Sequence, residues 1–240
     1  VSELTKSLFD VMPKTGFEVR RVEPFREASA SGGSYQAGTP DGSRPGIFYA
    51  NAYDIKARGK WAMESLFLHE AIPGHHFQIM IQRENESLPG FRRFGGFTAF
   101  SEGWGLYAES LGKELGVYTD PYQYFGALNA ELWRSVRLVV DTGLHAKQWT
   151  RQDVLDYMYA NAAVPDVRAI SEAERFMAIP GQALAYKVGQ LKIREIRTKA
   201  EAALGDKFDI KAFHTEVLKD GAMPLSMLEA KVDRWVKSQP

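Results

Sequence analysis

The 240-residue sequence contains no cysteine. This absence excludes disulfide bonds, thiolate metal sites and cysteine nucleophiles, so histidine, aspartate and glutamate are the strong ligands that remain for a metal. It does not fix the compartment, because a chain without cysteine suits the cytoplasm and the periplasm or a secreted protein equally.

Net charge and long apolar runs are also missing. Thirty basic residues balance thirty acidic ones, and no run of lysine and arginine is long enough to bind a polyanion, which argues against a nucleic-acid partner. No window approaches the ~20 apolar residues of a membrane span, and the N-terminus lacks a basic-then-apolar signal pattern. Because the sequence begins at Val1, a processed product or a piece of a longer protein is expected.

The length suits one domain with a substantial core, so a single domain over residues 1–240 is expected. Strand patterns occur before Lys60, and helical periodicity dominates after it. The predicted fold class is therefore mainly α with a small N-terminal β-sheet, antiparallel or mixed.

Two segments have the pattern of strands. Apolar residues alternate with charged ones from Phe17 to Val22, and Pro24 restricts this strand to an edge or an end. The run Gly46–Tyr53 has the composition of a buried strand. Between them lies a loop rich in Gly, Ser, Pro and Asp, in which Tyr35 marks a candidate short strand.

Apolar spacing and capping signals predict the helices. Thr150 and Ser171, each followed by an acid at the third helical position, are interpreted as N-caps, and Pro180 as the first residue of a helix. Helices are expected over Val1–Val11, Trp61–Glu70, Phe77–Glu86, Thr98–Leu115, Tyr122–His145, Thr150–Ala160, from Ser171 onward, and over Pro180–Ala203, Ile210–Leu218 and Leu225–Lys237.

Three of the five histidines lie between Leu68 and Gln78, in Leu-His-Glu-Ala-Ile-Pro-Gly-His-His-Phe-Gln. A metalloprotease helix of the HExxH type places two histidines one turn apart and a glutamate beside the first. Here the later histidines follow His69 at i+6 and i+7. On an unbroken helix the former points about 120° away and the latter lies roughly 10 Å along the axis, so neither could share an ion with His69.

Pro73 and Gly74 stand between His69 and the later histidines. Proline removes a backbone donor and glycine permits strained dihedral angles, so a break here can bring a later histidine back beside His69. His75 is favoured as second ligand because Gly74-His75 resembles the Gly-His that ends HExGH motifs, and His76 stays an alternative ligand or a residue behind the site. The competing interpretation is that these histidines are ordinary surface or core residues.

A hydrolytic zinc site needs three protein ligands and an open position for water, so a third ligand is required. Glu102 is the candidate, because a carboxylate is unfavourable to bury unpaired in an apolar helix, and Gly103 and Gly105 leave room beside it. The alternative is a partly exposed helical glutamate. Glu109 lies about 10 Å further along the same face, so it can orient a histidine but cannot share the ion.

A polar stripe is expected further along the chain, where Arg137, Asp141 and His145 recur every four residues. The stripe is either a solvated ion pair, or it places His145 at a helix end where it can donate to a transition-state oxyanion. Arg137 is a candidate substrate-binding residue.

The segment Arg175–Tyr186 supplies two more candidates. Tyr186 is the candidate proton donor to the oxyanion, and Arg175 is the candidate carboxylate anchor because its planar fork suits a peptide C-terminus. The alternative for Tyr186 is core packing with a satisfied hydroxyl. His214 has no evident partner in the sequence and is interpreted as a surface residue.

From Gly46 onward the chain contains, in this order, His-Glu-Ala-Ile-Pro-Gly-His-His-Phe-Gln, Phe-Ser-Glu-Gly-Trp-Gly-Leu-Tyr-Ala-Glu and Pro-Gly-Gln-Ala-Leu-Ala-Tyr. These motifs resemble the bacterial domain-of-unknown-function family numbered eight-eight-five, which is similar to gluzincin metallopeptidases. The resemblance implies a mostly helical zinc-peptidase-like fold with Glu70 as base, in longer proteins that carry an additional N-terminal helical portion. The sequence departs from the gluzincin pattern in its longer histidine spacing and in Leu106, where aspartate would follow the glutamate.

The predicted function is a zinc-dependent hydrolase of peptide bonds, with one zinc ion held by His69, His75 and Glu102. Glu70 is the expected general base, and a carboxypeptidase-like cleavage is among the modes considered. Asn51 and the strand before it are expected to hold the peptide substrate by strand addition. Two alternatives stay open: a metal-binding or interaction module without turnover, and a metal-dependent hydrolase of a non-peptide amide or ester.

Overall fold

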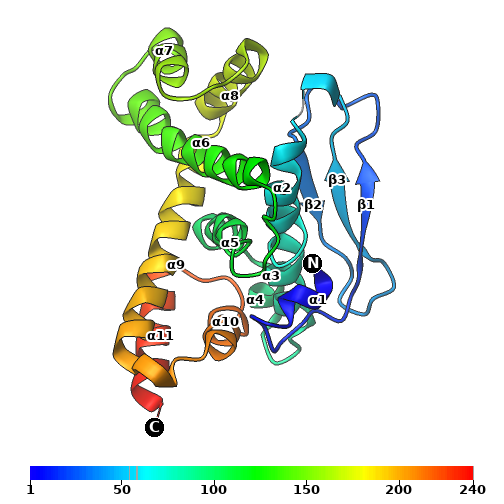
Figure 1. Ribbon diagram of the computed structural model, residues 1–240, viewed down its shortest axis with the longest axis vertical. Helices are drawn as coiled ribbons and strands as arrows, with labels where there is room; N and C mark the ends of the chain where they lie inside the picture. Colours follow the sequence, from blue (N-terminus) through cyan, green and yellow to red (C-terminus); the bar gives the residue numbers. More distant parts are fainter. Residues whose placement is uncertain (54, 58, 240) are drawn as a thin grey trace.

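The computed structural model describes residues 1–53, 55–57 and 59–239 of the chain. Most of these residues are helical, and within them three strands pair into one mixed sheet beside the helices (Figure 1). The prediction of a mainly α fold with a small N-terminal sheet is confirmed. No helix in this part of the chain is both long and apolar enough to cross a membrane.

The helices follow the predicted order with some changed boundaries. Thr150 caps its helix through the predicted capping box. The helical elements are α1 (Ser2–Thr5), η1 (Ile55–Ala57), η2 (Lys60–Ala62), α2 (Met63–Glu70), α3 (His75–Glu84), α4 (Gly90–Phe94), α5 (Thr98–Ser110), α6 (Pro121–Ala146), α7 (Arg151–Asn161), α8 (Asp166–Ala178), α9 (Gln182–Leu204), η3 (Gly205–Lys207), α10 (Ile210–Leu218) and α11 (Leu225–Ser238).

Two predicted helix boundaries in the outer helices are wrong. The first helix stops at Thr5 instead of Val11, because the chain turns there and carries Leu8 into the core. Ser171 lies inside α8 and not at its start, because that helix already begins after Pro165.

Glycines explain two further differences. The helix α5 ends at Ser110 instead of Leu115, since turns follow and Gly116 adopts a left-handed φ of 68°. Pro180 precedes α9 and does not lie in its first turn, because Gly181 is the N-cap with a left-handed φ of 80°.

The sheet consists of β1 (Phe17–Arg21), β2 (Gly33–Gln36) and β3 (Gly46–Ala50) in the order β1-β3-β2. Strand β3 pairs with β1 in parallel and with β2 antiparallel. Its backbone groups are therefore used on both sides, and the free edges of the sheet belong to β1 and β2. The prediction that a substrate adds to the strand β3 is wrong for this reason.

Asn51, which was expected to help hold the substrate, is a buried structural residue. Its amide N–H groups donate to the carbonyl oxygens of Glu27 and Ala30 at 2.8 and 2.9 Å, and its side-chain oxygen accepts from the backbone N–H of Tyr53. The side chain thus ties the loop after β1 to the end of β3.

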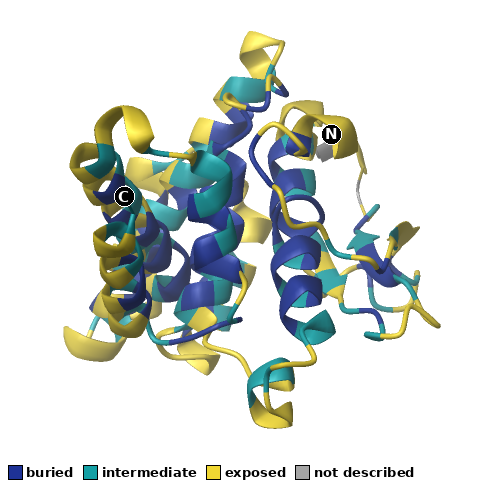
Figure 2. Cartoon of the chain, turned by 90° about the horizontal axis from the view of Figure 1, so that it is seen from below, coloured by how far each residue is buried: buried dark blue, intermediate teal, exposed yellow. Residues whose placement is uncertain are grey.

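The apolar interior is divided into two clusters, and Figure 2 shows the buried residues on the inner faces of the helices. The larger cluster, called here the main core, joins α2, α3, α5, α9, α10 and α11 through residues such as Leu68, Trp104 and Ile193. The smaller cluster, called the α6–α8 core, joins α6, α7 and α8 through residues such as Val140 and Phe176.

Close packing of α5 against α9 depends on two glycines. A Cβ on Gly103 would lie 2.4 Å from the Cα of Gly189, and a Cβ on Gly189 would lie 1.9 Å from the carbonyl oxygen of Ala99. Any larger residue would force the helices apart. This contact fixes the position of α9 relative to the helix that carries Glu102.

His214 is fully buried, so its interpretation as a surface residue is wrong. One ring nitrogen lies 2.8 Å from the carbonyl oxygen of Leu8, and the other lies 2.9 Å from the hydroxyl of Tyr107. The ring also stacks on Phe9, with ring centroids 4.5 Å apart. These partners are distant in the sequence, which is why the local sequence pattern does not reveal them.

Candidate metal centre

A break between α2 and α3 brings two histidines together, as the Pro73-Gly74 pair predicts. A Cβ on Gly74 would lie 1.9 Å from the carbonyl oxygen of His69, so glycine is the residue that fits where the chain passes. The indole N–H of Trp104 donates to the carbonyl oxygen of Pro73 at 2.8 Å. The break is therefore held against α5.

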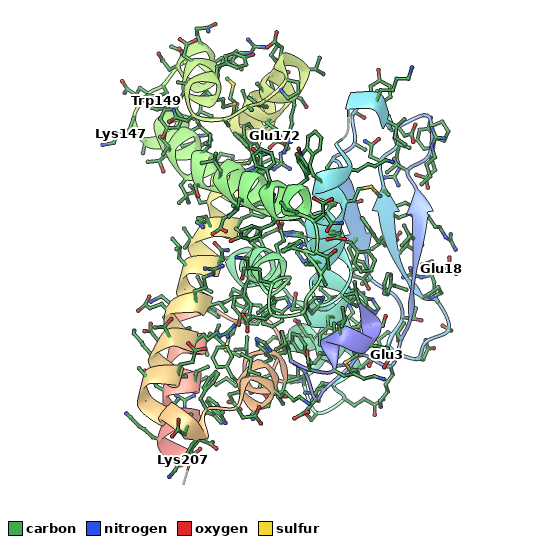
Figure 3. The ribbon with its side chains drawn as sticks, viewed as in Figure 1. Glu3, Glu18, Lys147, Trp149, Glu172 and Lys207 are labelled. Atoms are coloured by element: carbon green, nitrogen blue, oxygen red, sulfur yellow. The ribbon has the colours of Figure 1, made fainter. Side chains whose placement is uncertain are left out.

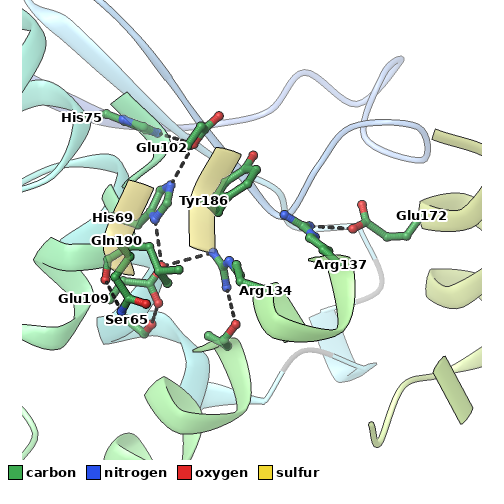
Figure 4. A network of polar contacts seen from close by, with 12 residues as sticks. Ser65, His69, His75, Glu102, Glu109, Arg134, Arg137, Glu172, Tyr186 and Gln190 are labelled. Atoms are coloured by element: carbon green, nitrogen blue, oxygen red, sulfur yellow. Dashed lines mark hydrogen bonds and ion pairs between the residues drawn. The ribbon is translucent and has the colours of Figure 1, made fainter. Parts of the chain in front are cut away.

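Figure 4 shows His69, His75 and Glu102 pointing toward one another. Atom Oε2 of Glu102 lies 3.5 Å from Nε2 of His69 and 3.3 Å from Nε2 of His75, and the candidate donor atoms all lie within 4.8 Å of one another. Tetrahedral ligands about 2.0–2.1 Å from zinc lie about 3.4 Å apart. Oε2 of Glu102 is also a buried oxygen without a hydrogen bond in the described part of the chain. The spacing and the donor types therefore fit a zinc ion.

His69 is oriented by a buried glutamate. Its Nδ1 lies 2.8 Å from Oε1 of Glu109, which also accepts from Nη2 of Arg134 at 3.1 Å, while Ser65 donates its hydroxyl proton to Oε2. A Cβ on Gly105 would lie 2.7 Å from the His69 ring, so this glycine lets the imidazole rest on α5. A carboxylate on one ring nitrogen fixes the tautomer and aims the other nitrogen at the cluster.

The electrostatics of the cluster favour a cation. Burial would lower the pKa of His69, but its close contacts with the carboxylates of Glu102 and Glu109 raise this pKa to about 9. Burial would likewise raise the pKa of Glu102, but its contacts with His69 and His75 hold it well below its usual range. A site that stabilises positive charge on its histidine in this way also suits a bound divalent ion.

Glu70 and His76 each directly follow one of the two histidines of the cluster in the sequence. Glu70 is buried, and its carboxylate makes no hydrogen bond with any described residue. His76 points elsewhere: its Nδ1 lies 2.8 Å from the hydroxyl of Tyr35, and burial lowers its pKa to about 4. Between the two adjacent histidines, the structure brings His75 into the cluster.

The start of α9 reaches the cluster through Tyr186 and Gln182. The ring of Tyr186 stacks beside His69, with centroids 6.0 Å apart, and burial and the Glu102 carboxylate raise the pKa of its hydroxyl. Gln182 donates from Nε2 to Oε1 of Glu102 at 3.2 Å and to the Tyr186 hydroxyl at 3.0 Å. The Tyr186 hydroxyl thus accepts from Gln182 and keeps its own proton for another acceptor.

Arginines form the wall beside Tyr186. Arg137 is buried, donates from Nη2 to Oε2 of Glu172 at 2.6 Å, and lies over the Tyr186 ring at 4.9 Å. Arg175 lies 3.4 Å from Glu172 through Nε and donates from Nη2 to Oε1 of Gln182 at 3.3 Å. Figure 3 shows Glu172 on α8 where that helix approaches α6.

The predicted stripe of Arg137, Asp141 and His145 does not form one functional surface. Asp141 is buried and accepts the backbone N–H of Gly181, while His145 is exposed and its Nε2 contacts the carbonyl oxygen of Phe176 at 2.9 Å. His145 lies at the end of α6 that Figure 3 marks by Lys147, about two helical turns beyond Arg137. The structure therefore does not place His145 in the cluster, and the oxyanion role predicted for it is not supported by this geometry.

A family model described as "Bacterial protein of unknown function (DUF885)" matches residues 1–232. The chain belongs to the DUF885 family. No curated protein matches it. Two solved structures, each described as a "putative lipoprotein", resemble this DUF885 chain. The one from Colwellia psychrerythraea is 43% identical with a TM-score of 0.97, and the match covers 99% of this chain and 41% of that one. The one from Shewanella oneidensis, described as of unknown function, is 24% identical with a TM-score of 0.76, and the match covers 96% of this chain and 45% of that one. The DUF885 chain thus spans less than half the length of either structure.

Several polar residues of the DUF885 chain that surround the cluster are not apparent from the sequence patterns. Arg134 lies about one turn before Arg137, between the buried apolar residues Trp133 and Val136. A charged residue between apolar ones was the sequence feature that could have marked Arg134 as a partly buried functional residue. Gln182 lies in the third motif, but as an uncharged residue it was not singled out as a functional candidate. Ser65 and Glu172 also belong to this set.

Proposed function

We propose that this DUF885 chain is a zinc-dependent hydrolase of peptide bonds. The observation that carries the proposal is the convergence of two histidine nitrogens and a glutamate oxygen. Nε2 of His69 and Nε2 of His75 lie 3.5 and 3.3 Å from Oε2 of Glu102, close to the spacing of tetrahedral zinc ligands, and the donor atoms of all three residues lie within 4.8 Å of one another. The similarity of the DUF885 family to gluzincin metallopeptidases supports the same proposal, although the histidine spacing is longer here and Leu106 stands where aspartate would follow the glutamate.

A zinc ion with three protein ligands keeps a position open for water and polarises a substrate carbonyl. Glu70 follows His69 directly, its side chain is buried, and its charge is close enough to help raise the pKa of His69. In the proposed reaction Glu70 would take a proton from the attacking water and deliver it to the nitrogen of the leaving amine. Tyr186 would donate its hydroxyl proton in a hydrogen bond to the developing oxyanion, because Gln182 already occupies the hydroxyl as donor.

The test separates the ligands from the base. Zinc content and hydrolysis of a mixed peptide library are measured for the wild-type chain, for His69→Ala and Glu102→Ala, and for Glu70→Gln. The first two variants should lose zinc by more than the ~10–100-fold typical of residues behind the ligands, whereas Glu70→Gln should keep zinc and lose turnover. His145→Ala is the matched control, since this exposed histidine should affect neither quantity.

Three outcomes would contradict the proposal. Zinc affinity unchanged by Glu102→Ala would remove Glu102 from the ligand set. Stoichiometric zinc without hydrolysis, in this chain and in a longer parent, would favour a metal-binding module. Hydrolysis of ester or non-peptide amide substrates alone would assign the site to a different hydrolase.

A further inference from the structure

One amide group connects the metal cluster to an arginine. Gln182 donates to Oε1 of Glu102 at 3.2 Å, and its own oxygen accepts from Nη2 of Arg175 at 3.3 Å. Two hydrogen bonds and the width of one amide therefore separate Glu102 from Arg175, a distance of at most about 9 Å. The guanidinium of Arg175 is therefore linked to a proposed zinc ligand through the side-chain amide of Gln182 alone.

Arg175 has donor groups to spare. It shares the Glu172 carboxylate with Arg137, which makes the shorter contact, 2.6 Å against 3.4 Å. Its Nη1 has no partner among the described residues, and the side chain is 33% exposed, whereas that of Arg137 is 9% exposed. Of the two arginines on Glu172, Arg175 is thus the one that can bind a ligand from solution.

The surroundings hold the Arg175 fork in place and limit its hydration. Its guanidinium lies 5.6 Å from the centre of the Phe176 ring, and Glu172 and Gln182 fix it from two directions. A planar guanidinium held in this way matches a carboxylate through two parallel hydrogen bonds. Partial removal of water strengthens such a charge-assisted pair.

We infer that Arg175 binds the C-terminal carboxylate of the peptide, so that the enzyme removes residues from the free C-terminus. The inference rests on the proposed function and names its substrate class. An extended residue spans about 3.5 Å, so a separation of at most about 9 Å leaves room for one or two residues between the scissile bond and the terminal carboxylate. Gln182 is the positioning residue that sets this spacing.

The first experiment compares a mixed peptide library carrying free C-terminal acids with the same library amidated. The zinc-loaded wild type should cleave the acids and release their last one or two residues. Arg175→Gln should raise KM for the acids about 10- to 100-fold and leave the amides unchanged, because a bidentate charged pair acts in the ground state and the transition state alike. Arg151→Gln is the control. It removes an exposed ion pair between Arg151 on α7 and Glu174, which neighbours Arg175 on α8.

The second experiment measures binding without turnover, by equilibrium dialysis of the two libraries against Glu70→Gln and against Glu70→Gln combined with Arg175→Gln. Selective binding of acids that depends on Arg175 supports the assignment of Arg175 as carboxylate anchor, even if the wild type hydrolyses nothing and the proposed hydrolase fails. Hydrolysis of acids and amides alike, with equal losses in Arg175→Gln, overturns the inference and leaves the hydrolase intact. Equal binding of both libraries together with no hydrolysis overturns both.

Discussion

The buried His214 should make the stability of the fold depend on pH. Burial lowers its pKa to about 3, while the unfolded chain has the ordinary value of about 6.5. The ring fits its site in the neutral form, since one nitrogen donates to the carbonyl oxygen of Leu8 and the other accepts from the Tyr107 hydroxyl. That hydroxyl already accepts from Nη1 of Arg197 at 3.1 Å, so a second donor and a second positive charge would be unfavourable there.

Because the folded-state pKa is depressed, the unfolded chain binds more protons in acid. The stability linked to His214 is fully present above about pH 6.5 and is lost as the pH falls toward about 3. Between pH 8 and pH 5 the loss amounts to about 2 kcal/mol, as follows from a folded pKa of about 3 and an unfolded pKa of about 6.5.

Urea unfolding of the metal-free protein, followed by tryptophan fluorescence at pH 8 and pH 5, measures this loss. His76, whose pKa burial also lowers, contributes in the same direction, so the test is the difference between wild type and His214→Gln. Glutamine can still donate to Leu8 and accept from Tyr107 but does not titrate. The wild type should lose about 2 kcal/mol more than the variant over this interval. Equal losses would show that His214 is protonated without penalty and would refute the reasoning.

Three further changes test the metal centre. Gly74→Ala should weaken zinc binding, because a Cβ would lie 1.9 Å from the carbonyl oxygen of His69. Gly90→Ala is the control and should leave zinc affinity unchanged, because a Cβ there would meet no atom within 4 Å. Equal zinc affinities of the two variants would show that the break between α2 and α3 is not required. Glu109→Gln should lower zinc affinity about 10–100-fold in a competition titration with a chelator, and an unchanged affinity would exclude an orienting role for Glu109. Tyr186→Phe should lower kcat by about two to three orders of magnitude at unchanged zinc content, and a loss of only a few-fold would leave Tyr186 as a packing partner of Arg137.

The helices and the cluster of His69, His75 and Glu102 could be predicted from the sequence because their signals are local. The Pro73-Gly74 pair predicted the break between α2 and α3, and Glu102 stood out as a carboxylate in an apolar helix. The same reasoning placed Glu109 on the correct face to reach His69, at 2.8 Å.

The features that sequence reasoning missed depend on contacts between distant segments. The order of the strands decides that β3 is central, and neither composition nor alternation contains that order. His214 is buried because Leu8 and Tyr107 come to it from far along the chain. Arg134 and Gln182 acquire their places only when α6 and α9 pack beside α5. Spacing along one helix cannot report such neighbours.

The candidate site is built from two apolar clusters, and the two parts can differ in local stability. The proposed zinc ligands lie on helices of the main core, whereas Arg175 is carried by α8 in the α6–α8 core. Helix α9 contributes Ala183 to the α6–α8 core and Ile193 to the main core. Cooperative units of local unfolding tend to follow such clusters. The α7–α8 pair can therefore open and carry away Arg175, the proposed substrate anchor, while the proposed zinc ligands stay assembled. A peptide bound at both places would tie the two units together, and slower amide hydrogen exchange in α8 would report its arrival.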